Sequence, residues 1–193
     1  MKKILFYIII FFILINKIIY AKNLEIMTLA SINNTSVTNL DLFNEIKLLE
    51  IIENKKISVE SQKLILNKFI DEKIKELETK EIKLNSNQLD SIENKMSLII
   101  NEINSKNLSF NNDIRKKLRK KLEISLKWEK LIYLKFKNKI EVNLNEIESL
   151  LKNKMQNKID REKIINFEKQ KKLKIISKGY FDKIKNKYLI EFY

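Results

Sequence analysis

The side chains best suited to bind another molecule are large aromatics in the second half of the chain. They are Trp128, Tyr133, Phe136, Phe167 and Tyr180. Aromatic rings bury much apolar area and dominate the energetics of many binding surfaces. Each of the five also fits a plain core position, and for any single residue that alternative carries more weight. These residues therefore predict an apolar contact surface rather than a catalytic centre.

The residue types that most catalytic and metal centres need are missing from the 193 residues. The chain has no Cys and no His, which removes disulfides, Cys-ligated zinc, the usual triads and the commonest general base. With one Gly and no Pro, it also has no Gly-rich loop for phosphates or dinucleotides. We therefore predict no catalytic residue, no metal site, no cofactor and no nucleotide, and we expect a protein that is not an enzyme.

The net charge of +14 has two interpretations. An excess of 39 Lys and Arg over 25 Asp and Glu suits an anionic partner such as nucleic acid or a membrane surface. The alternative is a compositional bias in which Lys covers solvated helix faces, and the interleaved acids favour it. The densest basic run, residues 115–121, follows an amphipathic pattern without interleaved aromatics. We therefore expect no nucleic-acid partner, and the envelope membrane surface stays open as a partner.

The first 21 residues have the pattern of a secretory signal peptide. Lys2 and Lys3 precede an uninterrupted apolar run over residues 4–15, and Ala21 offers a small residue before a cleavage point. A spanning helix needs roughly 20 apolar residues, which this run does not reach. We expect cleavage after Ala21 and a periplasmic location. The alternative is an uncleaved inner-membrane anchor over residues 4–20.

Turn residues are scarce, so we expect a mainly α fold with one small β-sheet. Residues 26–32 are apolar and partly β-branched, Asn33 and Asn34 suit a tight turn, and residues 35–37 can return as a second strand. The last residues, 188–193, are also strand-like, and an apolar terminal strand needs a partner. We predict that they pair with residues 26–32, so that the N- and C-terminal strands form the sheet.

Helical periodicity accounts for most of the remaining chain. Thr38 followed by Asp41 predicts a capped helix, and Ser58 is expected to start the next one. An apolar seam over residues 89–103 predicts a third helix. Residues 109–137 have the pattern of the longest helix, with apolar residues on two faces. We expect other helices to cover it on two sides.

Two further helices are expected towards the C-terminus. Asn143 and Glu146 form a capping pattern for a short helix, and Asp160 is expected to cap a last long helix. The apolar stripe of that last helix consists of Leu173, Ile176, Tyr180 and Ile184. We expect this stripe to cover one face of the longest helix. Gly179 within it permits a kink or a close helix contact, or is merely tolerated.

Three segments carry a resemblance to a known family. They are the hairpin IMTLASINNTSVT, the helical FIDEKI and the long segment LSFNNDIRKKLRKKLEISLKWEKLI. Their order resembles the N-terminal domain of SurA-type periplasmic chaperones over roughly residues 25–158. The tail FEKQKKLKIISKGYFDKIKNKYLIEFY is similar to that family's C-terminal helix and strand. The resemblance implies a multi-helix chaperone domain over residues 22–158, which residues 159–193 complete.

The chain departs from that family where catalysis is concerned. In the family, parvulin-type prolyl isomerase domains lie between the two parts. Here the part that resembles the N-terminal domain ends near residue 158 and the part that resembles the C-terminal helix follows at once, so there is no room for such a domain. The His that is characteristic of the parvulin pocket is also missing. The resemblance therefore implies chaperone action on unfolded outer-membrane proteins, without isomerase activity.

Three functions follow as hypotheses. The leading one is an ATP-independent holdase in the periplasm that binds unfolded outer-membrane proteins. The second is a membrane-tethered structural or docking subunit at the cell envelope. The third is a degenerate member of a peptidyl-prolyl isomerase family without catalysis.

Overall fold

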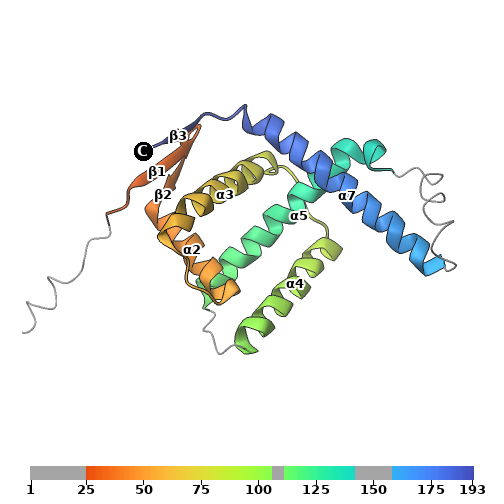
Figure 1. Ribbon diagram of the computed structural model, residues 1–193, viewed down its shortest axis with the longest axis horizontal. Coiled ribbons are helices and arrows are strands. Elements are labelled where there is room, and N and C mark those ends of the chain that lie inside the picture. The colour runs from red at the N-terminus through yellow and green to blue at the C-terminus, as the bar shows by residue number, and fades with distance from the viewer. Residues whose placement is uncertain (1–24, 106–110, 142–157) are drawn as a thin grey trace, which may run out of the picture.

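The computed structural model describes residues 25–105, 111–141 and 158–193. In chain order the elements are β1 (Thr28–Ile32), β2 (Thr35–Thr38), α2 (Asn39–Glu53), α3 (Val59–Glu78), α4 (Ser86–Ser105), α5 (Asn112–Ile140), α7 (Lys158–Lys185) and β3 (Ile190–Phe192). The described residues are mainly helical, and their small antiparallel sheet lies at one end of the helices (Figure 1). The predicted fold class is thus confirmed.

The sheet joins the N- and C-terminal ends of the described chain, as predicted. Its strand order is β2-β1-β3, and both strand pairs are antiparallel. Ile32 of β1 pairs with Thr35 across the hairpin and with Ile190 on its other side. Asn33 turns the hairpin in the left-handed conformation, with φ of 50°, which Asn tolerates better than most residues. β1 is therefore the central strand, and Ile32 is fully buried.

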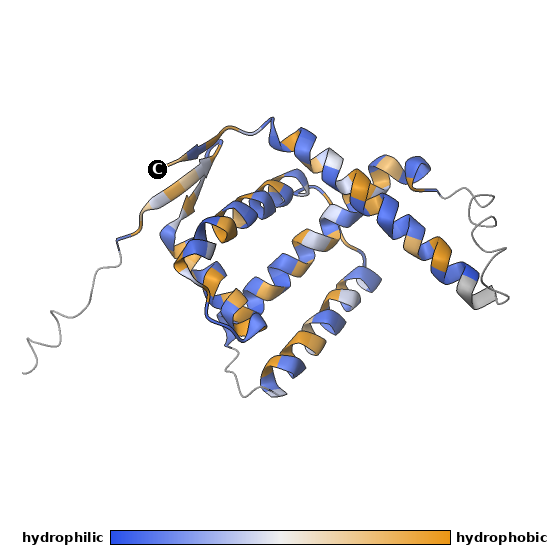
Figure 2. Cartoon of the chain, viewed as in Figure 1, coloured by the Kyte–Doolittle hydropathy of each residue, from blue (hydrophilic) through white to orange (hydrophobic). Residues whose placement is uncertain are grey.

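One hydrophobic core connects the sheet with α3, α5 and α7. Its buried members are Ala30, Ile32, Val37, Ile70, Ile74, Trp128, Leu131, Ile132 and Ile184. Hydrophobic and hydrophilic residues alternate along the helices (Figure 2), which is typical of helices that bury one side against their neighbours. A smaller cluster joins α2 and α5 through Leu48, Ile114 and Leu118. Because α5 contacts α2, α3, α4 and α7, it is covered on more than one side, as predicted.

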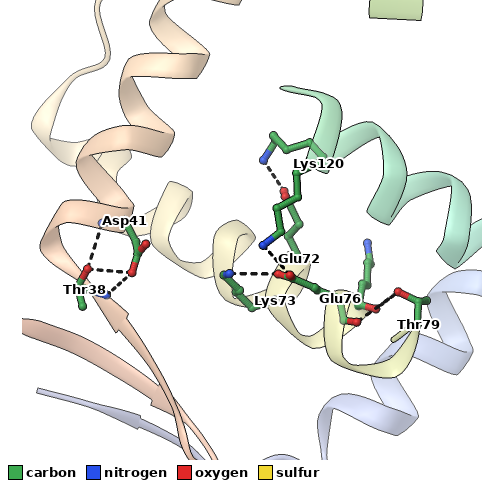
Figure 3. Close-up of polar contacts among 9 residues, drawn as sticks. Thr38, Asp41, Glu72, Lys73, Glu76, Thr79 and Lys120 are labelled. Atoms are coloured by element: carbon green, nitrogen blue, oxygen red, sulfur yellow. Dashed lines mark hydrogen bonds and ion pairs between the residues drawn. The ribbon is translucent and has the colours of Figure 1, made fainter. Parts of the chain in front are cut away.

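Local capping explains where the first helices begin. The Asp41 backbone N–H donates to Thr38 Oγ1 at 3.2 Å, and the Thr38 N–H donates to the Asp41 carboxylate at 3.0 Å. This reciprocal pair is the predicted capping box (Figure 3). Ser58 directly precedes α3, as predicted, although its side chain makes no capping bond. Before α4, Asn85 accepts from the Gln88 N–H at 3.0 Å.

The boundaries of α5 differ from the predicted span of 109–137. The Ile114 N–H donates to the Asn111 side chain at 2.9 Å, so Asn111 caps the helix and α5 begins directly after it. The helix continues to Ile140, beyond the predicted end. Phe136 has non-helical torsion angles, φ −130° and ψ 18°, which mark a kink near the end of the helix.

The start of α7 is also a correction. Asp160 was expected to cap this helix, but it lies inside α7, which already includes Lys158. Gly179 lies within the continuous helix, and a Cβ placed there would meet no atom within 4 Å. It therefore makes no close helix contact, and the reading that Gly is merely tolerated fits the structure best.

Several predictions fall outside the described residues. They are the signal peptide over residues 1–21 with its cleavage at Ala21, the alternative anchor over residues 4–20, and the Asn143 and Glu146 cap. Within the described residues, no helix has the length and apolar content needed to cross a membrane.

Candidate functional site

The crossing of α5 and α7 is where most of the predicted contact residues gather. The two helices cross near the C-terminal end of α5 (Figure 1). Leu173, Ile176 and Tyr180 of α7 pack against the core there, and Ile184 is one of its buried members. This confirms the prediction that the apolar stripe of the last helix covers one face of the longest helix.

Trp128 is the best-anchored side chain of this crossing. Its side chain is buried, and its indole N–H donates to Ser177 Oγ at 2.8 Å. Tyr180 stacks on the Trp128 ring with a centroid distance of 5.8 Å, and Phe181 meets it edge-on at 5.9 Å. The Lys75 ammonium of α3 lies 5.7 Å from the ring centroid. Side chains of α3 and α7 thus hold this α5 ring in place.

A groove lies on one side of the crossing, between residues 125–132 of α5 and residues 167–177 of α7. We call it the Trp128 groove. Its apolar lining consists of Trp128, Ile132, Phe167 and Leu173, and its polar lining of Ser125, Glu129, Gln170, Lys171, Lys174 and Ser177. Its volume is about 540 Å³, within the range of known ligand pockets. Phe167 remains 66% exposed, so an incoming chain can contact its ring without any rearrangement of the core.

The structure does not bring the five predicted contact residues into one surface. Trp128 and Phe167 line the Trp128 groove together, whereas Phe136 and Tyr180 line a second groove on the other side of the crossing. Tyr133 is 55% exposed on α5, but it is not among the described lining residues of either groove. Trp128 and the half-buried Phe136 and Tyr180 also pack in the hydrophobic core. These three residues therefore fit both a core position and a place in a groove lining.

Sequence reasoning missed the polar residues that hold these rings. Ser177 accepts the only hydrogen bond that the Trp128 indole can donate, although the two residues are 49 positions apart. Lys75 lies near Trp128 and within 5.0 Å of the Phe181 ring centroid. Serines and lysines are common at helix positions of this chain, so no sequence signal distinguishes Ser177 and Lys75 from the others.

An ion network that joins α2, α3 and α5 was also missed. Lys121 Nζ lies 2.6 Å from Glu45 Oε1 and also pairs with Glu72. Burial acts to lower the pKa of the Lys121 ammonium, but attraction from these two carboxylates raises it above its usual value. The pKa of the Glu72 carboxyl lies above its usual value, because burial raises it and the Glu45 carboxylate adds to this, although Lys121 acts to lower it. Glu45 interrupts the apolar stripe of its helix, which was an available signal.

Three of the six cations in the basic run of residues 115–121 form ion pairs with carboxylates of the described residues. Arg119 pairs with Glu93 of α4, and Lys120 Nζ lies 2.6 Å from Glu76 Oε1 of α3 (Figure 3). Together with Lys121, these cations tie α5 to three neighbouring helices. Throughout the part of the chain that the structure describes, acidic side chains form no group of three or more that could hold a metal ion.

Comparison with known proteins leaves the family of this chain open. No protein-family model matches it, and no curated protein sequence matches it. The described residues form a mainly helical domain. Its sheet combines the first two strands with the last one, and its last helix borders two grooves.

Proposed function

We propose that the protein is an ATP-independent holdase that binds unfolded outer-membrane proteins in the periplasm. The observation that carries this proposal is the Trp128 groove, where an exposed and a buried aromatic ring line one apolar depression. Strands of outer-membrane barrels alternate apolar and polar residues. Their apolar side chains suit the floor of such a groove, and their polar side chains suit its rim.

The lining of the groove favours weak and sequence-tolerant binding. Gln170, Lys171 and Lys174 are long side chains that can move aside or cover apolar surface with their stems. Leu134 and Ile175 are 56% and 64% exposed on the same two helices. They are not among the described lining residues of the groove, and they add exposed apolar area elsewhere on these helices for a client that offers many short apolar segments.

The order of elements supports the same function. It resembles SurA-type periplasmic chaperones, and the chain has no nucleotide-binding motif, which is consistent with action without ATP. The expected signal peptide over residues 1–21 agrees with a periplasmic location.

Light scattering by a urea-unfolded outer-membrane β-barrel protein tests the proposal. After dilution of the urea without ATP, we expect the full-length protein to delay aggregation of this client. It should protect a soluble, apolar-poor client much less. Phe167→Ser should weaken protection several-fold while the helical circular-dichroism signal stays unchanged, because Phe167 is exposed. Tyr133→Ser is the matched control, since Tyr133 is an exposed aromatic on α5 away from the described lining of both grooves.

Two outcomes would overturn parts of this proposal. Unchanged scattering with a several-fold molar excess of wild-type protein would exclude the holdase and favour the membrane-tethered docking subunit with one fixed partner. Equal loss of protection in Phe167→Ser and Tyr133→Ser would exclude the Trp128 groove as the client site.

A further inference from the structure

The second groove at the α5–α7 crossing combines apolar side chains with lysines. Its apolar lining consists of Phe136, Ile176, Tyr180 and Ile184, and its charged lining of Lys135, Lys139, Lys183 and Lys187. Gly179 completes the lining, and the volume is about 420 Å³. We call it the lysine groove. It shares no lining residue with the Trp128 groove.

The positive charge of the lysine groove is not balanced by its own lining. No acidic residue is among the described residues that line it. None of its four ammonium groups forms an ion pair with another described residue. By contrast, Lys120 and Lys121 of the same helix α5 both pair with carboxylates of neighbouring helices. A concave surface of one sign therefore remains, and it favours an anionic partner.

The two helices leave this groove open through different backbone features. The kink at Phe136 changes the direction of the last residues of α5, which include Lys139. On α7, Gly179 contributes no side chain, and an added Cβ would meet no atom within 4 Å. A larger side chain at Gly179 can therefore occupy the groove without displacing the core.

The state of the aromatic rings argues against nucleic acid as the partner. Phe136 meets Tyr180 edge-on at a centroid distance of 5.4 Å, and Tyr180 stacks on Trp128. The Lys135 ammonium lies 5.2 Å from the centroid of the Tyr180 ring. Base stacking needs a free ring face, and the Tyr180 ring already contacts Trp128, Phe136 and Lys135.

The shape of the groove favours a peptide over a membrane surface. A flat membrane surface reaches the lysines at the rim of a groove but not its apolar floor, whereas side chains of a peptide reach both. All four cations are lysines, whose compact ammonium groups pair with single carboxylates. We propose that the lysine groove binds an acidic peptide segment in which apolar side chains alternate with Asp or Glu. This proposal goes beyond the holdase function and does not depend on it.

Fluorescence anisotropy with a labelled synthetic peptide tests the proposal. The probe alternates glutamate with leucine and phenylalanine, and the protein is the full-length chain. We expect saturable binding that weakens strongly when salt is raised, because salt screens the lysine charges. The double variant Lys139→Glu/Lys183→Glu should lower the affinity by about tenfold. Lys163→Glu/Lys169→Glu, at exposed positions of α7 away from both described linings, should leave the affinity within about twofold.

The floor of the groove is tested through Gly179. Gly179→Leu should lower the affinity for the peptide several-fold, because the new side chain occupies the site. Gly179→Ala should bind like the wild type, since its single methyl group enters open space. Both variants should keep the circular-dichroism spectrum of the wild type.

Four results would overturn the proposal. The first is the lack of saturable peptide binding, and the second is an equal loss of affinity in both double variants. The third is a single-stranded oligonucleotide that displaces the peptide, binds more tightly than the peptide does, and needs Lys139 and Lys183 for binding. The fourth is binding of phosphatidylglycerol vesicles that needs Lys139 and Lys183 and that the peptide does not compete with. The last two would replace the peptide with nucleic acid or with a membrane surface.

Discussion

Asn33 and Leu189 exchange two hydrogen bonds across the sheet. The Asn33 backbone N–H donates to the Leu189 carbonyl at 2.8 Å, and the Leu189 N–H donates to the Asn33 side-chain oxygen at 2.9 Å. Asn33, a turn residue of the N-terminal hairpin, thus binds the backbone of the residue directly before β3. Because the two residues are 156 positions apart, their contact ties the two ends of the described chain together.

Substitution of Asn33 should therefore destabilise the whole domain. Ala is strained at the positive φ of this position, and Asn33→Ala also removes the side-chain hydrogen bond to the Leu189 N–H. We therefore expect the free energy of unfolding to fall by about 2 kcal/mol. Asn33→Gly keeps the backbone conformation and loses only the bond, so the fall should be about 1 kcal/mol. Urea unfolding followed by circular dichroism measures both. Asn34→Ala, at the exposed neighbouring position, should change stability by less than about 0.5 kcal/mol, and a larger effect there would contradict this account.

Deletion of residues 188–193 should lower the melting temperature of the protein. It removes β3, leaves one edge of β1 unpaired and removes the bond from the Tyr188 hydroxyl to Glu78. The loss should amount to a few kcal/mol of a typical total of roughly 5–15 kcal/mol. Calorimetry provides the measurement, and Tyr193→Ser, at a position that is 75% exposed, provides the control. An unchanged melting temperature in the truncated protein would show that β3 does not contribute to stability.

The Tyr188 hydroxyl should lose its proton at a higher pH than an ordinary tyrosine. Burial and the hydrogen bond to Glu78 raise the pKa of Tyr188 from 10.0 to about 12. The folded state therefore holds this proton more tightly than the unfolded state. The stabilisation is complete below pH 10 and is lost as the pH rises through about 12. Tyrosinate absorbance should show a component in the wild type that titrates near pH 12 and that is lost in Tyr188→Phe. An alkaline titration that is the same in both proteins would contradict this prediction.

Removal of the Lys121 charge should be costly at neutral pH. Lys121→Met leaves the Glu45 and Glu72 carboxylates partly buried without their cation, and we expect a loss of about 2 kcal/mol at pH 7. Burial already raises the pKa of the Glu72 carboxyl, and loss of Lys121 raises it further. A raised carboxyl pKa means that protonation stabilises the folded state as the pH falls, so the loss should shrink towards pH 5.

Urea unfolding at the two pH values provides this comparison. Lys116→Met is the control, because Lys116 is exposed on the same helix and has no ion pair among the described residues. It should change stability by less than about 0.5 kcal/mol at either pH. A loss in Lys121→Met that grows as the pH falls would be incompatible with the assigned network.

The protein should not accelerate cis–trans isomerisation of a prolyl test peptide. This prediction rests on the sequence, which has no His, and on the proposed SurA-type order of elements, which places no parvulin domain between its two parts. A protease-coupled assay with the full-length protein measures the rate. Saturable catalysis that a single substitution abolishes would contradict the prediction.

Local signals in the sequence were sufficient for most elements of the fold. The Thr38 and Asp41 capping box, the turn at Asn33 and the apolar stripe of α7 each depend on residues that are close in the chain. The pairing of the two terminal strands was also predictable, because an apolar strand at the C-terminus needs a partner and only one was available. The start of α5 was not, since Ser109 and Asn111 are both suitable caps.

The candidate site was decided by the tertiary structure. Phe167 and Tyr133 are both aromatic residues on amphipathic helices, yet only Phe167 lines the Trp128 groove. The bond from Trp128 to Ser177 likewise joins residues that no local pattern connects. By itself, the sequence determined which face of each helix is apolar, because side-chain direction follows helical periodicity. Which part of that face is covered depends on the angle and position at which α7 crosses α5, and only packing between distant residues sets these.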